Sequence, residues 1–278
     1  MQRSDCRVRE QLAEDMASDG LNSEAMDTFI EAAKCWQRWE SFSKAAICYE
    51  RAYEHGMLCH RYADAAEAMM RASQVWMKQG EHEKFEIDCQ IASEAYIMAA
   101  EEERNPKRFV QGAFCAILGG DIDMARHLIH AAAETTRGEA KELINLALML
   151  SEYQFGDADM YIEAAVARVV DRDEMAVIRE HFKLAFLGFV RTSLESEFAI
   201  SVRSLSESTG LPEKKVEALV KRGIAEGLLP GYFDDDTREI VVDTDRADVS
   251  TLARRKKPIL SQDIEDPGAW DLDLDDDL

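Results

Sequence analysis

Breaks between helical segments recur at a nearly constant spacing, and this spacing limits the folds that the chain can adopt. Ser41, Glu81 and Asp121 lie forty residues apart, and Asp157 follows after thirty-six. Each break opens an alanine-rich segment with a residue that suits a helix N-cap. Apolar residues recur at helical spacing in eight segments: 23–38, 42–54, 62–78, 84–103, 106–118, 122–134, 141–155 and 158–169.

Paired helices of this kind predict a stack. One helical hairpin cannot bury its apolar face alone, so successive hairpins must pack on one another. We therefore expect a polar N-terminal helix over residues 1–20, helical repeats over 21–140, and a last hairpin with a long apolar helix over 141–195. Gly56 and Gly156 are expected to end helices. The alternative is an irregular, alanine-rich helical bundle.

The charge balance narrows the class of partner. The 278 residues carry 33 Lys and Arg against 55 Asp and Glu, a formal net charge of -22. Such a chain repels nucleic-acid backbones and anionic membrane surfaces at long range, so protein partners are favoured and membrane contact is expected only indirectly. The same charge is also explained by solubility alone.

The six cysteines are spread singly through helical segments and form no C-x-x-C pair. No segment reads as a signal peptide or reaches the ~18 apolar residues of a membrane span. These features predict reduced, mostly buried cysteines in a cytoplasmic protein.

Candidate chemistry is sparse. His127 and His130 lie three apart on one expected helix. Cys48, His55, Cys59 and His60 gather around a helix end. Neither set has the spacing of a known zinc site, and the phosphate-binding and nucleophile motifs are absent from the sequence. The sequence therefore predicts no enzyme, no metal site and no cofactor.

The pattern changes at residues 200–242. Two short helical segments flank Gly210 and Pro212, and Gly227 closes the second one. Two short apolar runs then flank three consecutive aspartates at 234–236, which predicts a β-hairpin. A helix-turn-helix followed by a hairpin is a winged helix, which we place at residues 196–245.

Three stretches together resemble a PCI domain, the module shared by subunits of the proteasome lid, the COP9 signalosome and the translation initiation factor complexes. They are LALMLSEYQFGDADMYIEAAVARV, the apolar helix with Phe182, Leu187 and Phe189, and the run IAEGLLPG before the hairpin. The resemblance implies a mainly α fold: a right-handed α-solenoid of helical hairpins followed by a winged helix with a small β-hairpin. It also implies a scaffold or adaptor subunit that binds partners along the repeat groove.

By the same resemblance, the winged-helix hairpin assembles with another subunit or with a second copy through its edge. The residues implied are Tyr232, Phe233, Ile240, Val241 and Val242. A winged helix can also bind DNA, which would make the chain a transcription regulator. Lys and Arg at 214, 215, 221 and 222 favour that use, whereas Glu at 213, 217 and 226 and the acidic turn oppose it.

A second resemblance concerns the repeats. CWQRWESFSKAAICYERA is similar to the repeats of soluble NSF attachment proteins (SNAPs), which couple a coiled-coil complex to an ATPase in membrane traffic and have an acidic C-terminus. Residues 246–278 are expected to be a disordered basic linker and acidic tail. The tail is either a binding motif or only solubilising, and the motif would use Trp270, Leu272, Leu274 and Leu278.

Overall fold

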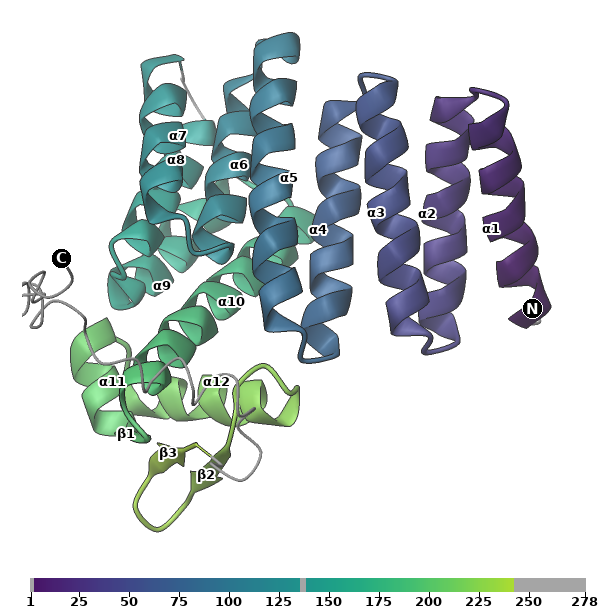
Figure 1. Ribbon diagram of the computed structural model, residues 1–278. Helices are drawn as coiled ribbons and strands as arrows, with labels where there is room; N and C mark the ends of the chain where they lie inside the picture. Colours follow the sequence, from purple (N-terminus) through teal and green to yellow (C-terminus); the bar gives the residue numbers. More distant parts are fainter. Residues whose placement is uncertain (1–2, 136–138, 243–278) are drawn as a thin grey trace, which may run out of the picture.

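The computed structural model describes residues 3–135 and 139–242, and it is mainly helical (Figure 1). A three-stranded sheet lies near the C-terminal end of the described chain. The helices are α1 (Arg3–Ser18), α2 (Asn22–Arg38), α3 (Phe42–Leu58), α4 (Tyr62–Lys78), α5 (His82–Glu103), α6 (Pro106–Leu118), α7 (Ile122–Thr135), α8 (Glu139–Ser151), α9 (Phe155–Ala164), α10 (Arg172–Ser196), α11 (Val202–Thr209) and α12 (Glu213–Ala225), with a 3-10 turn at Val166–Arg168. The strands are β1 (Ala199–Ser201), β2 (Tyr232–Asp234) and β3 (Glu239–Val241).

Consecutive helices from α1 to α8 pack side by side, and Figure 1 shows that they alternate in direction along a row. The predicted helices at 62–78 and 106–118 are confirmed residue for residue. Helix α10 crosses behind the row and leads to α11, α12 and the sheet, which lie together at one end (Figure 1). We call residues 199–242 the C-terminal α/β unit. Within the described chain, no helix combines the length and the apolar character needed to cross a bilayer.

The turns of the row repeat every twenty residues. Gly20, Glu40, His60 and Gly80 all have left-handed backbone conformations. After each of them, the next backbone N–H donates to a carbonyl five residues earlier, for example from Ser41 to Trp36 at 3.0 Å. This closure satisfies a carbonyl that the helix end leaves open. One reversal every twenty residues gives one hairpin every forty, which accounts for the spacing of the breaks.

Two glycines were expected to end helices, and both predictions are wrong. Gly56 lies inside α3, which continues to Leu58, and a Cβ at Gly56 would lie 2.9 Å from the Cβ of Ala65 on α4. Gly156 lies in the first turn of α9, because the preceding helix already ends at Ser151. Both glycines are needed for close contact between helices, not for a turn.

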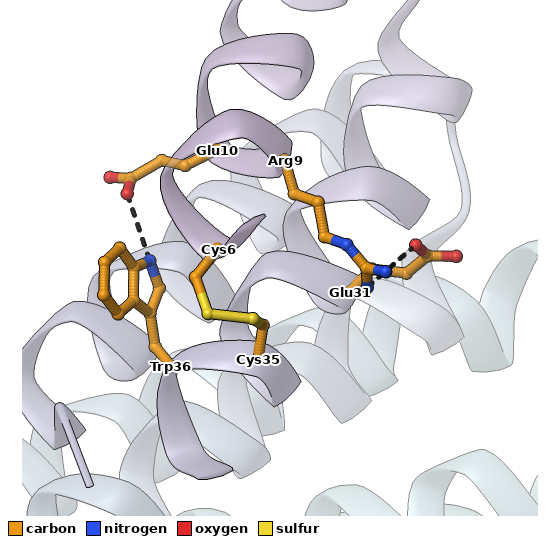
Figure 2. Close-up of a disulfide and its surroundings, with 6 residues drawn as sticks. All are labelled: Cys6, Arg9, Glu10, Glu31, Cys35 and Trp36. Carbon is orange, nitrogen blue, oxygen red and sulfur yellow. Dashed lines mark hydrogen bonds and ion pairs between the residues drawn. A yellow bond between two sulfur atoms is a disulfide. The ribbon is translucent and has the colours of Figure 1, made fainter. Parts of the chain in front are cut away.

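The cysteines also differ from expectation. Cys6 on α1 and Cys35 on α2 form a disulfide, with Cα atoms 5.4 Å apart (Figure 2). The prediction that the cysteines are reduced is therefore wrong for this pair, because adjacent antiparallel helices bring the two residues face to face. The remaining four have free thiols, and three of these are buried: Cys48, Cys89 and Cys115.

Candidate protein-interaction site

Local sequence signals specify where the helices of the C-terminal α/β unit begin and end. The Ser201 side chain caps α11 by accepting a hydrogen bond from the Ser204 backbone N–H at 3.1 Å. Gly210 ends that helix with a φ of 71°, a left-handed conformation that glycine adopts without steric cost. Pro212 then precedes the first residue of α12. The predicted order of helix, turn, helix and hairpin is confirmed.

A third strand, which the sequence analysis missed, completes the sheet. Strand β1 pairs with β3, so the strand order is β1-β3-β2. Ile200 pairs with Ile240, and Ile240 pairs with Phe233 on the other side. These residues form the inner row of the sheet, which packs into the main core. The only sign of this strand in the sequence was Ile200, an apolar residue in a stretch without helical spacing. A strand of three residues is too short to show an alternation of apolar and polar residues.

The extra strand changes which predicted residues lie at an edge. Strand β3 is central, so the backbones of Ile240 and Val241 are paired on both sides, and the Ile240 side chain is fully buried. Val242 is also buried. Among the predicted hairpin residues, only Tyr232 and Phe233 lie on an edge strand, β2. Of the hairpin that was predicted to act as an interaction edge, only β2 is an edge strand.

Tyr232 is the most accessible of the predicted hairpin residues. Its side chain is 53% exposed and aligns with Val241 and Ala199 in the outer row of the sheet. Phe233 is half-buried, and the Lys221 ammonium group lies 4.5 Å from its ring centroid. This cation–π contact ties β2 to α12. The edge strand is therefore held in place while one aromatic side chain remains available.

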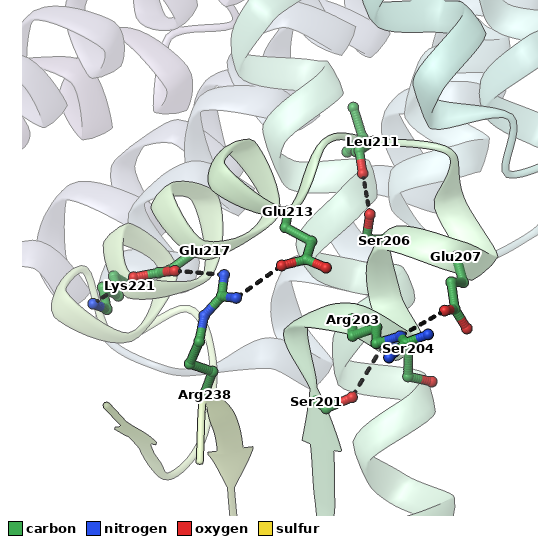
Figure 3. Close-up of polar contacts among 10 residues, drawn as sticks. All are labelled: Ser201, Arg203, Ser204, Ser206, Glu207, Leu211, Glu213, Glu217, Lys221 and Arg238. Carbon is green, nitrogen blue, oxygen red and sulfur yellow. Dashed lines mark hydrogen bonds and ion pairs between the residues drawn. The ribbon is translucent and has the colours of Figure 1, made fainter. Parts of the chain in front are cut away.

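Carboxylates of α12 lie next to Lys221 of the same helix and Arg238 of the hairpin (Figure 3). Lys221 donates to Glu217 at 2.8 Å and to Asp235 at 2.7 Å. Arg238 from the hairpin donates to Glu213 at 2.8 Å and to Glu217 at 3.0 Å. These hydrogen bonds, first from Lys221 and then from Arg238, lower the pKa of Glu217. Lys221 and Arg238 are thus engaged by carboxylates of the same unit.

The hairpin turn carries negative charge. The Asp234 carboxylate accepts hydrogen bonds from the backbone N–H groups of Asp236 at 2.9 Å and Thr237 at 3.3 Å. These bonds lower the pKa of Asp234, so it stays ionised. Phosphate groups would be repelled from this turn, whereas a basic protein surface would be attracted.

Close contacts join the unit to the helical row. A Cβ at Gly156 on α9 would lie 2.4 Å from the carbonyl oxygen of Gly210, so the two backbones nearly touch. Lys183 on α10 is buried and its ammonium group binds Glu180 at 2.8 Å and Glu226 at 2.9 Å. Glu226 directly follows α12. These contacts fix α11 and α12 to α9 and α10.

Helix α10 is in turn fixed to α5. The Arg191 guanidinium donates to Nδ1 of His82 at 3.1 Å and forms an ion pair with Glu86. An imidazole nitrogen that accepts a hydrogen bond must be unprotonated. Burial, and secondarily the positive charge of Arg191, lowers the pKa of His82 to about 4, which keeps the ring neutral. The long predicted linker helix therefore joins both parts of the chain.

The groove predicted along the repeats can be compared with a cleft that α10 helps to line. The cleft, of about 530 Å³, lies between α4, α6, α8 and α10. Its walls mix apolar residues with ion pairs, such as Lys107–Glu174 at 2.7 Å and Arg71–Glu67. The ion pairs cancel one another, so the cleft has no strong preference for either sign of charge.

The remaining predicted features give no further site. In residues 3–135 and 139–242, no three His, Cys, Asp or Glu side chains are grouped closely enough to hold a metal ion. The predicted tail motif, Trp270, Leu272, Leu274 and Leu278, lies outside the described residues. Comparison with known proteins found no match, either among protein-family models or among curated proteins.

Proposed function

We propose that this chain is a non-enzymatic scaffold subunit, in which a helical-repeat arm presents a PCI-like winged helix for assembly with another protein. The observation that carries the proposal is strand β2, an edge strand with the exposed aromatic residue Tyr232. Edge strands offer unpaired backbone groups that a strand of another chain can complete. The partner is either another subunit or a second copy of this chain.

The rigid attachment of the unit supports this role. Contacts of Gly156 with Gly210 and of Lys183 with Glu226 join it to the arm, as described above. A partner strand bound at β2 would therefore be held at a defined angle to the helical row. Defined geometry is what a scaffold needs, because it positions two partners relative to each other.

The charges argue against the transcription-regulator alternative. A recognition helix needs cations that are available to phosphates and base edges. Lys221 is instead bound to Glu217 and Asp235, and Lys215 to Asp159. The acidic turn would also face the backbone of any DNA approached in the usual orientation.

A substitution at the edge strand tests the proposal. Tyr232→Lys places a charge on β2, a device that natural edge strands use to prevent pairing. We expect it to abolish self-association in sedimentation velocity experiments, or to remove copurifying subunits from an affinity purification quantified by mass spectrometry. Leu58→Lys is the matched control, because Leu58 is also a large exposed hydrophobic residue (64% against 53% for Tyr232) but lies at the end of α3.

The outcomes are distinct. Loss of assembly in the Tyr232 variant but not in the Leu58 variant supports strand pairing at β2. Equal assembly in both variants and the unmodified chain refutes it. The SNAP-like alternative makes a different prediction, since deletion of residues 263–278 should then remove an ATPase from the purified complex and leave assembly through β2 unchanged.

A further inference from the structure

Helix α1 is the terminal helix of the row and has few apolar contacts. Among its residues 5–18, only Cys6 and Ala13 are buried, whereas α2 buries seven residues. The outer face of α1 contains Val8 and Leu12, which are 66% and 47% exposed. Their counterparts forty residues later on α3, at positions 48 and 52, are fully buried. Within residues 3–135 and 139–242, α1 therefore packs mainly on α2, whereas the inner helices of the row pack on a helix at each side.

Helix α1 nevertheless covers a substantial apolar surface. Ala13 packs in one cluster with Met26 and Phe29 of α2, both of which are buried. Glu10 accepts a hydrogen bond from the indole N–H of Trp36 at 3.1 Å, so α1 also covers the edge of that ring (Figure 2). These large side chains would reach water if α1 moved away, which makes α1 the cap of the row.

The ion pairs of α1 are too exposed to hold it firmly. Arg9 and Glu31 form an ion pair at 3.5 Å, and both side chains are largely accessible (Figure 2). Glu14 pairs with Arg51 under similar conditions. Ion pairs at the surface contribute little to stability because water and salt screen them. The covalent Cys6–Cys35 bond is therefore the strongest tie between α1 and α2.

The bond is placed where a reversible change would act first on α1. Cys6 lies in the first turn of α1, near a helix terminus, where local opening costs least. Cys48 and Cys89 are buried thiols deeper in the row, and burial raises the pKa of each to about 12. Such thiols are poor nucleophiles, so exchange with the Cys6–Cys35 bond is not expected from them.

We propose that Cys6 and Cys35 are a reversible thiol modification site that controls whether α1 stays docked on α2. In the disulfide state α1 covers Met26, Phe29 and Trp36. In the dithiol state α1 separates and uncovers that face of α2. The inference is independent of the assembly proposed at β2, because it concerns the opposite end of the helical row.

The thiol–disulfide exchange is balanced in atoms and electrons when a dithiol is the reductant. Both sulfurs are buried, so opening of the first turn of α1 comes first. A thiolate of the reductant then attacks Sγ of Cys6, and the electron pair of the broken S–S bond leaves with Sγ of Cys35, which takes up a proton. The second thiol of the reductant resolves the mixed disulfide, is itself oxidised, and leaves Cys6 as a thiol. Oxidation by a disulfide reverses each step.

Hydrogen exchange measured by mass spectrometry on the full chain tests the proposal, with dithiothreitol as the probe. Reduction is expected to raise exchange roughly a hundredfold in peptides from α1, as the loop constraint on α1 opening is lost. Peptides around Met26 and Phe29 should also exchange faster, whereas α5 and α6 should not change. Alkylation of free thiols before and after reduction shows which cysteines are bonded.

Two variants make the result specific. The double variant Cys6→Ser, Cys35→Ser should show fast α1 exchange with or without dithiothreitol. Cys59→Ser, at a free and half-buried cysteine, should behave as the unmodified chain. The proposal is overturned if α1 exchange is the same in both redox states, if all helices lose protection together, or if alkylation finds six free thiols under oxidising conditions.

Discussion

The buried carboxyl group of Asp88 on α5 gives the sharpest prediction for stability. The residue is only 6% exposed, and its Oδ2 atom has no hydrogen-bond partner among the described residues. Burial, followed by the negative charge of Glu50, raises its pKa from the ordinary value of 3.8 to about 7, against the opposing effect of Lys84. The folded protein therefore keeps a proton on Asp88 that the unfolded chain releases in mildly acidic solution.

The sign of the pH dependence follows from this difference. Because the pKa is higher in the folded state, Asp88 does not oppose folding below about pH 4 and opposes it increasingly as the pH rises towards 7. A pKa raised from 3.8 to about 7 corresponds to about 4 kcal/mol, since each tenfold change in proton affinity is worth about 1.4 kcal/mol. We expect Asp88→Asn to remove this dependence.

Urea unfolding of both proteins between pH 4 and pH 8 is the assay. The difference in unfolding free energy between Asp88→Asn and the unmodified chain should grow by about 4 kcal/mol in favour of the variant across that range. An unpaired amide adds an offset of about 1–3 kcal/mol, but this offset does not change with pH. The test is therefore how much the difference in unfolding free energy grows between pH 4 and pH 8, not its value at any one pH.

Asp123 provides the matched control. Its side chain is 98% exposed on α7, so Asp123→Asn makes the same chemical change without burial. That variant should stay within about 0.5 kcal/mol of the unmodified chain at every pH. A difference for Asp88→Asn that is constant between pH 4 and pH 8 would refute the reasoning, because Asp88 would then be ionised or protonated equally in both states.

Three glycine substitutions test the packing. Gly56→Ala should lower stability by about 1–3 kcal/mol in urea unfolding, because its Cβ would lie 2.9 Å from Ala65. Gly188→Ala is the control on α10: no atom of the described residues lies within 4 Å of the Cβ it would add, so helix propensity should raise stability by up to about 1 kcal/mol. Gly156→Ala should cost about 3 kcal/mol or more and increase hydrogen exchange in α11, since the carbonyl of Gly210 cannot move aside. Equal effects at all three positions would contradict the packing described.

The helical row could be predicted from the sequence because its signals are local. Turn residues such as Gly80 and Gly120 and the N-capping Asn105 before Pro106 mark the boundaries directly. A glycine that ends a helix and a glycine that lets two helices touch look alike in one sequence, which is why Gly56 was misplaced. The distinction depends on Ala65 and Met26, which belong to neighbouring helices.

The candidate interaction site was predicted less completely. The hairpin has local signals, but its exposed edge is decided by β1, which comes more than thirty residues earlier in the chain. Without β1, Ile240 appears as available as Tyr232. The Cys6–Cys35 bond is a similar case, because no motif links the two residues and only the antiparallel contact of α1 with α2 brings them together.

The twenty-residue spacing of the turns also determines which changes in length the chain can absorb. Gly20, Glu40, His60 and Gly80 each reverse the chain once, so loss of twenty residues would transfer every later helix to the opposite side of the row. Loss of forty residues removes one hairpin and leaves the alternation unchanged. Proteins built on this plan should therefore differ in length by steps of forty residues, with the arm shortened or extended by one hairpin and its end unit still facing the same way.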